Sequence, residues 1–557
     1  MKRSIHIIFL FLLVNPVFAT NFFITRATTT VDGNGVVNPG DTLTLESGTR
    51  DFLLFKNLVG SAQNPIVIIN QHNQVEINTN HFYGIKFDRC SHIKLTGKAN
   101  PAIKYGIYIS RVGNGTGVTV DNYSTDFEME NVEVANIPIA GIYIKTDPFY
   151  ANDCSYAHRD NFTMKNISVH DCYIHDVEDE GMYIGSSKYT GTTITGTVSG
   201  YNDHCGSTSV LPHIIEGVRV YDNIVEDTGW DGIQVSSTTK DCFIYNNVIR
   251  NDSYKETQFQ MSGILIGGGS NCDCYNNKIY DGKGDGIDIL GLGNAKIYNN
   301  LIVRAGASYH PSDPPTTWQK HGIWIGHVST TAGSQTLIYN NTIVGPRSFG
   351  MKLTNPNISS YKVYNNIIVD PGLFETLGEN AYINISAGVN FESSNNQVAS
   401  TISSVGFVNS NSDNYDLIGT SPAVNTGMNL LGFGLSFDID DRVRPFAGFY
   451  DIGAYESQDP TIGIEDRGEN QSKIIIESIS PNPITYESIL RIQLEEPSYL
   501  RISILDPLGK LMEVIVDESK DNGNHSFTIS KSGFEPGLYF LVVESQFGKV
   551  SKKLIII

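Results

Sequence analysis

The residues of this chain whose types and positions best suit catalysis or metal binding are acids next to glycine. Glu180, Asp231 and Asp285 each precede a glycine, as does His321, and Asp288 follows shortly after Asp285. Two neighbouring carboxyls can hydrolyse a glycosidic bond, because one protonates the leaving oxygen while the other activates water. Grouped carboxylates can instead bind Ca²⁺. A third interpretation is structural, since Asp before Gly is a common turn sequence.

Two short phrases recur along the chain and predict the frame that holds these acids. The first is Tyr, a polar pair and two apolar residues, and its second polar position is Asn at residues 223, 247, 277, 300, 341 and 366. The smallest spacing is 23 residues, and the longer spacings are that unit plus a loop. The second phrase, Gly-Ile-X-Ile, alternates with the first. Short strands and turns at this period predict a parallel β-helix.

The stacking of the predicted coils gives approximate positions for the acids. Coils repeat at about 4.8 Å, so Glu180 and Asp231 should be about 4.8 Å apart along the axis. Asp231 and Asp285 should be two coils, about 9.6 Å, apart. The repeated Asn suits a turn that needs a left-handed backbone, and its amide can also hydrogen-bond to the Asn of the next coil.

The residue X of each Gly-Ile-X-Ile phrase is expected to face solvent, because the two apolar residues face the core. The row contains Lys86, Tyr108, Tyr143, Tyr183, Gln234, Leu265, Asp288, Trp324 and Lys352. Exposed aromatic rings on successive coils can stack on sugar rings. The candidate substrate-binding residues are therefore Tyr143, Tyr183, Trp230, Gln234 and Trp324. The alternative is that Tyr simply suits an exposed strand position.

Two insertions, residues 186–216 and 305–319, interrupt the repeat on either side of Asp231. Long loops of a solenoid tend to lie on its binding face, so both favour a site at the acids. A polysaccharide lyase would also need a base that removes a proton beside a uronate carboxylate. The candidates for this base are Lys240, Lys320, His321 and His327.

The Asn and Gly-Ile-X-Ile phrases resemble those of the right-handed parallel β-helix, or pectate-lyase-like, superfamily over residues 22–425. The resemblance implies the fold, and we place the β-helix at residues 20–425. It implies no single reaction. The chain matches no lyase active-site motif, and it lacks the three-Asp and Gly-His-Gly pattern of polygalacturonase-like β-helices.

Residues 426–456 are predicted to close the open end of the solenoid, and the polar residues 457–473 to form a linker. Asp438 and Asp440, with Asp441, are weak candidates for Ca²⁺ ligands. The alternative is an Asp-rich turn with Arg442 and Arg444 as partners.

Residues 474–557 alternate strands with turn residues and predict a small antiparallel β-sandwich. The segments Ser480–Pro483, Asp506–Lys510 and Pro536–Tyr539, with the basic and then apolar end, resemble the C-terminal sorting domain of the type IX secretion system. The resemblance implies export through both bacterial membranes by that machinery, removal of the domain, and release or surface attachment. An unrelated immunoglobulin-like binding module is the alternative. The predicted fold class is all-β: a right-handed parallel β-helix followed by an antiparallel sandwich.

The N-terminus and the composition fit an exported protein. Residues 1–19 contain two basic residues, an apolar run and a small-residue cleavage site, which predicts a signal peptide. No other run is long enough to cross a membrane. The net charge of −20 argues against nucleic acid as the main partner.

The seven cysteines lack the spacing of a zinc site. Cys242 and Cys272 occupy equivalent positions and are expected to stack in neighbouring coils, whereas Cys154 and Cys205 could bridge two loops.

Together these features predict an exported protein that binds and cleaves a polysaccharide, by hydrolysis or by a lyase reaction with Ca²⁺. The candidate catalytic residues are Glu180, Asp231, Asp285, Asp288 and His321. The alternative is a non-catalytic surface protein of the same fold that binds glycan or acts in adhesion.

Overall fold

The structure is a computed structural model that describes residues 19–148, 156–194, 208–309, 319–326, 329–372, 378–446, 448–458, 474–506, 511–545 and 548–556. Most of the signal peptide, the linker, Cys154, Cys205 and His327 lie outside these ranges. The described residues form two compact units, a solenoid to about residue 400 and a second unit beyond it. No helix among them is long and apolar enough to span a membrane.

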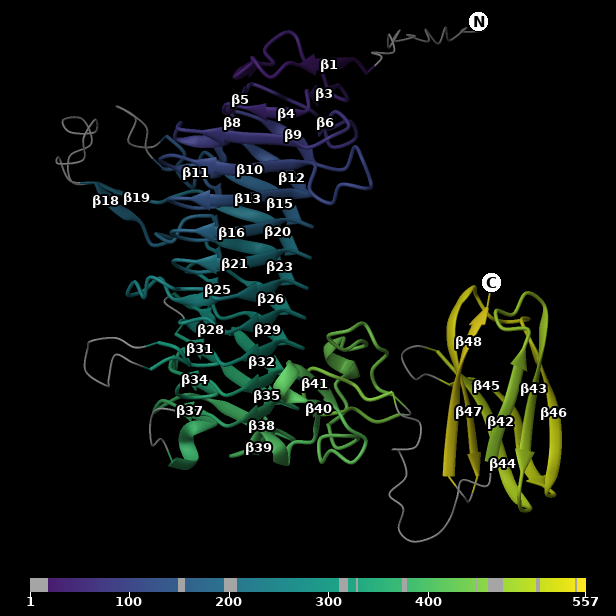
Figure 1. Ribbon diagram of the computed structural model, residues 1–557. Helices are drawn as coiled ribbons and strands as arrows, with labels where there is room; N and C mark the ends of the chain where they lie inside the picture. Colours follow the sequence, from purple (N-terminus) through teal and green to yellow (C-terminus); the bar gives the residue numbers. More distant parts are fainter. Residues whose placement is uncertain are drawn as a thin grey trace, which may run out of the picture. The chain divides into compact units, whose positions relative to one another are not determined.

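Three parallel sheets form the solenoid, and each coil contributes one strand to each sheet in the order A, C, B (Figure 1). Sheet A consists of β1 (Asn21–Ile24), β3 (Thr42–Leu45), β6 (Ile66–Asn70), β9 (Ser91–Thr96), β12 (Thr125–Glu130), β15 (Thr163–His170), β20 (Ile214–Tyr221), β23 (Thr238–Tyr245), β26 (Cys272–Tyr275), β29 (Ala295–Tyr298), β32 (Gln335–Tyr339), β35 (Ser360–Tyr364) and β38 (Phe391–Ser394).

Sheet C consists of β4 (Gly48–Arg50), β7 (Val75–Thr79), β10 (Ile107–Val112), β13 (Val132–Ile137), β16 (Tyr173–Val177), β21 (Ile224–Thr228), β24 (Val248–Arg250), β27 (Lys278–Tyr280), β30 (Leu301–Val303), β33 (Thr342–Val344), β36 (Ile367–Val369) and β39 (Gln397–Ala399). Sheet B consists of β2 (Thr30–Asp32), β5 (Leu53–Lys56), β8 (Tyr83–Asp88), β11 (Thr116–Asp121), β14 (Ile142–Ile144), β17 (Met182–Ile184), β22 (Ile233–Val235), β25 (Ser262–Ile266), β28 (Asp285–Ile289), β31 (Ile323–Ile325), β34 (Met351–Leu353) and β37 (Ile383–Ile385).

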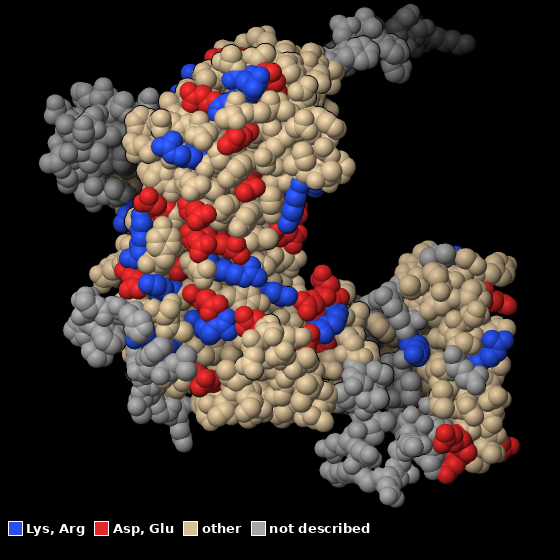
Figure 2. Space-filling view, viewed as in Figure 1, with Lys and Arg blue, Asp and Glu red and all other residues tan. Residues whose placement is uncertain are grey.

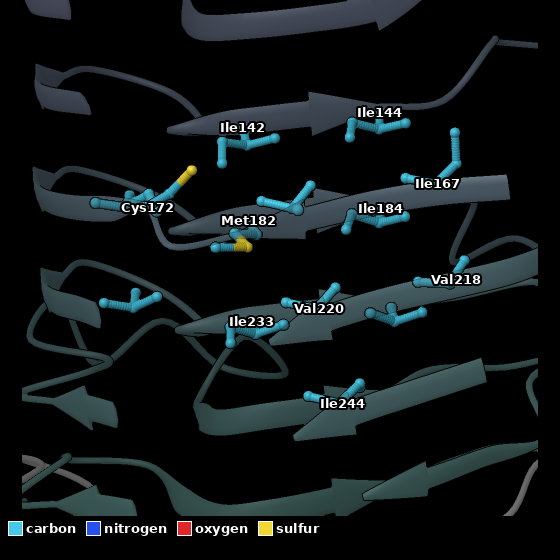
Figure 3. Close-up of a cluster of buried hydrophobic side chains, with 14 of the residues drawn as sticks. Ile142, Ile144, Ile167, Cys172, Met182, Ile184, Val218, Val220, Ile233 and Ile244 are labelled. Carbon is cyan, nitrogen blue, oxygen red and sulfur yellow. The ribbon is translucent and has the colours of Figure 1, made fainter. Parts of the chain in front are cut away.

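The core of the solenoid is a continuous stack of aliphatic side chains, which confirms the predicted parallel β-helix. Ile142, Met182 and Ile233 occupy one register position on successive strands of sheet B, and each is fully buried. Figure 3 shows this packing, with side chains of sheets A and B meeting inside the coils. Because inward and outward residues alternate along each strand, the other side chains of sheet B leave the core.

The asparagine phrase forms the turn from sheet A to sheet C, where its two polar residues have different roles. The first has φ of 51–56° at residues 246, 276, 299, 340 and 365. The second is buried, and its amide donates to the side-chain oxygen of the next Asn at 2.9–3.0 Å all the way from Asn223 to Asn366. The prediction gave both roles to the second Asn. The prediction of the left-handed backbone was wrong for the second Asn. The first polar residue of the phrase has the left-handed backbone, and the second Asn follows it with its side chain buried.

The stacked cysteines are also bonded to each other. Cys242 and Cys272 are register partners on β23 and β26, as predicted for neighbouring coils, and they form a disulfide. Cys90, Cys172 and Cys274 are free and buried. The bond links two successive coils of the solenoid.

The three sheets end at β39, before residue 425 where the sequence placed the end of the β-helix. The residues that follow form an antiparallel pair, β40 (Phe407–Asn409) and β41 (Asn414–Leu417), and irregular turns. Short 3-10 turns lie at η2 (Gly378–Ala381), η3 (Ile402–Ser404), η4 (Ser410–Ser412) and η5 (Leu431–Phe433).

The C-terminal residues form the predicted antiparallel sandwich, with a core of its own (Figure 1). One sheet contains β42 (Ile474–Ser480), β43 (Glu487–Leu494) and β46 (Gly523–Ser530). The other contains β44 (Ser498–Leu505), β45 (Leu511–Lys520), β47 (Gly537–Ser545) and β48 (Gly548–Ile556).

Candidate functional site

The predicted acid column exists and lies at the corner where each coil passes from sheet C to sheet B. The Gly181 N–H donates to the Asp231 carbonyl, and the Gly232 N–H donates to the Ser262 carbonyl, both at 3.0 Å. Ser262 pairs with Asp285, and the Gly286 N–H reaches the His321 carbonyl at 2.9 Å. The acid column is therefore Glu180, Asp231, Ser262, Asp285 and His321, one residue from each successive coil.

Three coils of sheet B are covered beside this column, contrary to the expectation that residue X faces solvent, whereas the X residues Tyr143, Tyr183 and Trp324 are partly exposed. Gln234, Leu265 and Asp288 lie in register on β22, β25 and β28, yet they are only 1%, 7% and 8% exposed. The loop after β17 crosses this face, because the Ser237 hydroxyl donates to the Ser186 carbonyl at 2.6 Å. Alternation along the strand directs a side chain away from the core, but it cannot show that a loop covers it.

Asp285 is held by two donors. The Lys320 ammonium lies 3.2 Å from Asp285 Oδ2, and the His321 N–H donates to Asp285 Oδ1 at 2.5 Å. Asp285 therefore forms a buried ion pair with Lys320. Although burial disfavours its charge, Asp285 and Asp288 raise the pKa of Lys320. Lys320 is therefore a fixed cation next to the column.

The other carboxyls near Asp285 favour their protonated forms. Burial, followed by the charge of Asp285, raises the pKa of Asp288 well above its usual value. Burial likewise raises the pKa of Asp231, whose Oδ1 accepts a hydrogen bond from the Ser262 hydroxyl at 2.7 Å. Burial also raises the pKa of Glu180 to about 7. Carboxyls with raised pKa values therefore lie in one buried cluster with the ion pair of Asp285 and Lys320.

Asp252 belongs to the same cluster and was not predicted. It follows β24, is 1% exposed, and its pKa is raised by burial to about 7. A side chain at Gly282, one coil further on, would collide with it, since a Cβ there would lie 1.8 Å from Asp252 Oδ2. Asp252 stands in an irregular loop outside both repeated phrases, so the period gave no signal for it.

Several oxygens of the cluster have no hydrogen-bond partner among the described residues. They are Asp231 Oδ2, Asp252 Oδ2, Asp288 Oδ1 and Gln234 Oε1. Oxygen atoms of this kind suit Ca²⁺. Nevertheless, Glu128, Glu130 and His170 form the only group of three potential metal ligands within 4.8 Å of one another in the described part of the chain. Lys94 and Lys98 already pair with those two glutamates.

The candidate bases of a lyase are poorly suited to that role. Burial lowers the pKa of His321 to about 4, and its Nδ1 accepts from the Phe349 N–H at 3.3 Å, so the ring is neutral and enclosed. Lys320 is protonated, as argued above. Lys240 lies on β23 in sheet A, away from sheet B, and its side chain is 65% exposed beside Asp241.

The predicted aromatic row is only partly present. Tyr143 and Tyr183 are register partners whose rings meet edge to face at 5.7 Å, and the Lys145 ammonium lies 5.1 and 4.6 Å from their centroids. Trp230 and Trp324 are half-buried, and Trp324 pairs with Asp288 in register. Tyr108 was assigned to this row incorrectly. It lies on β10 in sheet C, because the same phrase can occupy either sheet.

A second aromatic row was missed, although its residues are part of the asparagine phrase. Tyr221, Tyr245, Tyr275, Tyr298 and Tyr339 stack in parallel at 4.7–4.9 Å, and His170 extends the column. These rings cover one another's faces. The column therefore stabilises the outside of sheet A and leaves little ring face for a ligand.

Two hollows of the surface bear on the site, the larger at the corner between sheets C and B and the smaller over sheet B and the ends of its strands. The smaller, about 130 Å³, lies over Gln234 and Leu265, with Tyr189 and Phe259 among the residues around it. The larger, about 420 Å³, lies in the N-terminal coils and contains none of the acids of the column. No acid of the column lines the smaller hollow either, but its Leu265 is the register partner of Asp288 on the next strand.

The Asp-rich turn near the end of the chain matches the structural alternative to a Ca²⁺ site. The Asp438 carboxylate accepts from the N–H groups of Asp440, Arg442 and Glu456 and from Arg442 Nε, at 2.8–2.9 Å. Arg444 is instead paired with Glu456 at 2.9 Å. With four donors on Asp438, the geometry does not support the prediction of a metal site at Asp438 and Asp440.

Two family models match the chain. Residues 149–326 and 214–421 match the right handed beta helix region, and residues 478–557 match the secretion system C-terminal sorting domain. The protein is therefore a right-handed parallel β-helix protein with a type IX sorting domain. It is exported, and it is secreted or attached to the cell surface. No curated protein matches the sequence.

Several solved structures are similar at low identity. The enzymatically active domain of tailspike protein 2 from bacteriophage CBA120 has 10% identity, with 93% of this chain and 72% of that chain covered and a TM-score of 0.32. A PL6 family polysaccharide lyase from Pseudopedobacter saltans has 14% identity, with 67% of this chain and 92% of that chain covered and a TM-score of 0.29. DFA-IIIase from Arthrobacter chlorophenolicus A6 has 9% identity, with 65% of this chain and 84% of that chain covered and a TM-score of 0.34. At these TM-scores none of the likenesses bears on the activity.

Proposed function

We propose that the protein binds a polysaccharide on the outer face of sheet B and hydrolyses it with the carboxyls of Asp285 and Asp288. The observation that carries the proposal is the contrast between these two acids on one strand. Asp285 is ion-paired with Lys320 at 3.2 Å. Burial, followed by the charge of Asp285, raises the pKa of Asp288 well above its usual value, which favours a protonated carboxyl there. A proton donor and a charged carboxylate are the two groups that glycosidic hydrolysis requires.

The residues around this pair supply supporting roles. Asp231 is fully buried and accepts a hydrogen bond from Ser262 one coil further on, so it is a positioning residue. Glu180 and His321 extend the column on either side. The ligand would contact Tyr143, Tyr183, Trp230, Gln234 and Trp324. Of these, Gln234 lines the smaller hollow and Trp324 lies one coil beyond Asp288.

A lyase with Ca²⁺ is the second candidate. It is favoured by the unpartnered oxygens of Asp231, Asp252 and Asp288, which are ligands of the type that Ca²⁺ prefers. It is disfavoured by the state of its bases, since Lys320 is protonated and His321 is enclosed. A non-catalytic glycan-binding protein is the alternative outside enzymology.

The test uses the full-length protein with neutral and uronic polysaccharides, with and without Ca²⁺. Reducing ends and the absorbance of unsaturated uronates are followed together. We expect reducing ends alone, and we expect Asp288→Asn to lower the rate by about 10²–10⁴-fold while the polysaccharide still binds. Asp273→Asn is the matched control, because Asp273 lies on β26 in sheet A, outside the column.

Each other outcome identifies a different function. A rise in both signals that depends on Ca²⁺ would establish the lyase. Full activity of Asp288→Asn would remove the proton donor from the mechanism. Binding without product from any polysaccharide would establish the non-catalytic alternative.

A further inference from the structure

The larger hollow lies at the corner between β7 and β8, in the N-terminal coils. Its lining consists of Asp51, Asn78, Thr79, Asn80 and His81, and its volume is about 420 Å³. It lies on the same corner of the solenoid as the acid column. Six strand spacings separate β7 from β27, which leads into Asp285, so the axial distance is about 29 Å.

Glycines on the next coil keep the hollow open. The corner between β10 and β11 contains Gly113 and Gly115, where other coils carry side chains. A Cβ at Gly113 would lie 2.8 Å from Asn80 Oδ1, and one at Gly115 would lie 1.8 Å from the Phe82 carbonyl oxygen. Only glycine fits at either position, so no side chain from this coil fills the space.

The polar groups of the hollow are largely unused. The side-chain amides of Asn78 and Asn80 are exposed and make no hydrogen bond to any residue that the structure describes. Nδ1 of His81 is buried and likewise has no partner among the described residues. Each amide offers both a donor and an acceptor. Such groups match sugar hydroxyls, which also donate and accept.

Aromatic rings border these polar groups. The ring of Phe52 stacks on His81 at 3.9 Å, and Tyr83 meets His81 edge to face at 4.5 Å. Phe82 is 66% exposed, although burial of its ring would be favourable. An exposed ring beside free amides offers an apolar surface for the C–H face of a sugar.

We propose that this hollow is a second, non-catalytic binding subsite for a neutral sugar. The lining includes the carboxylate of Asp51 and no lysine or arginine, which disfavours an acidic sugar. A polysaccharide lying along this corner of the solenoid would contact the hollow and the acid column together. The inference shares with the proposed function only the class of ligand, because binding here requires no catalysis at Asp288.

The experiment measures binding of the full-length protein by calorimetry and affinity electrophoresis. The probes are xylan, β-1,3-glucan and galactomannan as neutral polysaccharides, and polygalacturonate and alginate as acidic ones. The variants are Phe82→Ala and the double variant Asn78→Ala/Asn80→Ala, all at exposed positions that leave the core intact. Phe23→Ala is the control, since Phe23 is a similarly exposed phenylalanine, 53%, on β1 of sheet A. Thermal melting verifies the fold of each variant.

We expect the wild type to bind at least one neutral polysaccharide, and Phe82→Ala to weaken that binding about fivefold. The double Asn variant should weaken it as well, Phe23→Ala should not, and cleavage of short oligosaccharides should be unchanged in all of them. Equal affinity of wild type and both hollow variants would overturn the inference. So would binding to acidic polysaccharides only, or to none. If Asp288→Asn stays active while the hollow variants lose affinity, the catalytic assignment fails and the subsite stands.

Discussion

Asn277 tests whether the buried asparagine column holds the coils together. Its Nδ2 donates to Asn300 Oδ1 at 3.0 Å and to the Ile244 carbonyl at 2.9 Å. Its Oδ1 accepts from the backbone N–H of Asn247 at 3.1 Å and from Asn247 Nδ2 at 3.0 Å. The change Asn277→Ala removes these four hydrogen bonds and a fifth from Nδ2 to Cys274 Sγ at 3.4 Å.

The loss in free energy of unfolding is smaller than the sum over these hydrogen bonds, because most of the partner groups keep another hydrogen bond. Asn247 Nδ2 still reaches the Val220 carbonyl at 2.9 Å, and Asn300 Oδ1 still accepts from the Asn277 N–H at 3.0 Å. The group with no remaining acceptor is the backbone N–H of Asn247, and such a buried donor costs about 1–3 kcal/mol. With a further ~1 kcal/mol for the small cavity, we expect a loss of about 2–4 kcal/mol.

Asn277→Asp separates hydrogen bonding from volume. The carboxylate keeps the acceptor for Asn247 but places an oxygen against the Ile244 carbonyl and Asn300 Oδ1. This buried charge raises the pKa of the new carboxyl, so its folded form binds a proton more tightly than the unfolded chain does. The destabilisation should therefore grow as the pH rises above about 4. At pH 7 Asn277→Asp should lower the free energy of unfolding more than Asn277→Ala does. At low pH the difference between the two variants should become smaller.

The assay combines denaturant unfolding with hydrogen exchange, because solenoids can open locally. The peptide that contains the Asn247 amide should exchange faster in Asn277→Ala. Asn271→Ala is the control. The Asn271 side chain hydrogen-bonds to Thr239 and Asn294 of neighbouring coils. It is only half-buried, so water can replace these hydrogen bonds in the variant. Equal losses for the Asn277 and Asn271 variants would refute the reasoning.

Three further predictions concern stability, each measured by thermal melting. The pKa of Glu180 is raised to about 7, so the folded state loses roughly 3 kcal/mol as the pH rises from about 4.5 past 7; Glu180→Gln should raise the melting temperature at pH 8 and leave it unchanged at pH 4.5. Replacing Cys242 and Cys272 together by Ala should cost about 3–4 kcal/mol, the entropy of closing a 30-residue loop; an unchanged melting temperature would contradict the disulfide. Asp285→Asn should cost about 3–5 kcal/mol, because it leaves Lys320 buried without a partner, whereas the neutral isostere Asp288→Asn should cost much less.

The repeat predicted the coil, the asparagine column, the stacking of Cys242 on Cys272 and the order of the acids, because all of these depend on positions that recur once per coil. The disulfide and the periodic tyrosine column on sheet A were not predicted. Parallel strands in register convert equal positions in the sequence into neighbours in space. The fold and the column therefore needed no information beyond the spacing of the phrases.

Other features of the site are not periodic, and the sequence could not place them. Asp252 lies in a loop that is unique to its coil, so nothing in the repeat aligns it with Asp285. Burial of Gln234 depends on the loop after β17, one coil earlier, and no repeated phrase describes that loop. Tyr108 shows the complementary failure, since alternation is the same on sheets B and C and cannot tell them apart.

The tyrosines on sheet A form a column of parallel rings at an even spacing along the solenoid. The rings of Tyr221 and Tyr275 each lie 4.9 Å from that of Tyr245, and the planes differ by 2° and 3°. Removing the middle ring would leave one vacant ring position between the rings of Tyr221 and Tyr275, which a flat aromatic molecule could occupy in place of the tyrosine ring. Each tyrosine with a ring on both sides could be replaced in this way, so a planar dye could be placed at a chosen coil of the solenoid. The coil repeat would then set the distance between two such dyes.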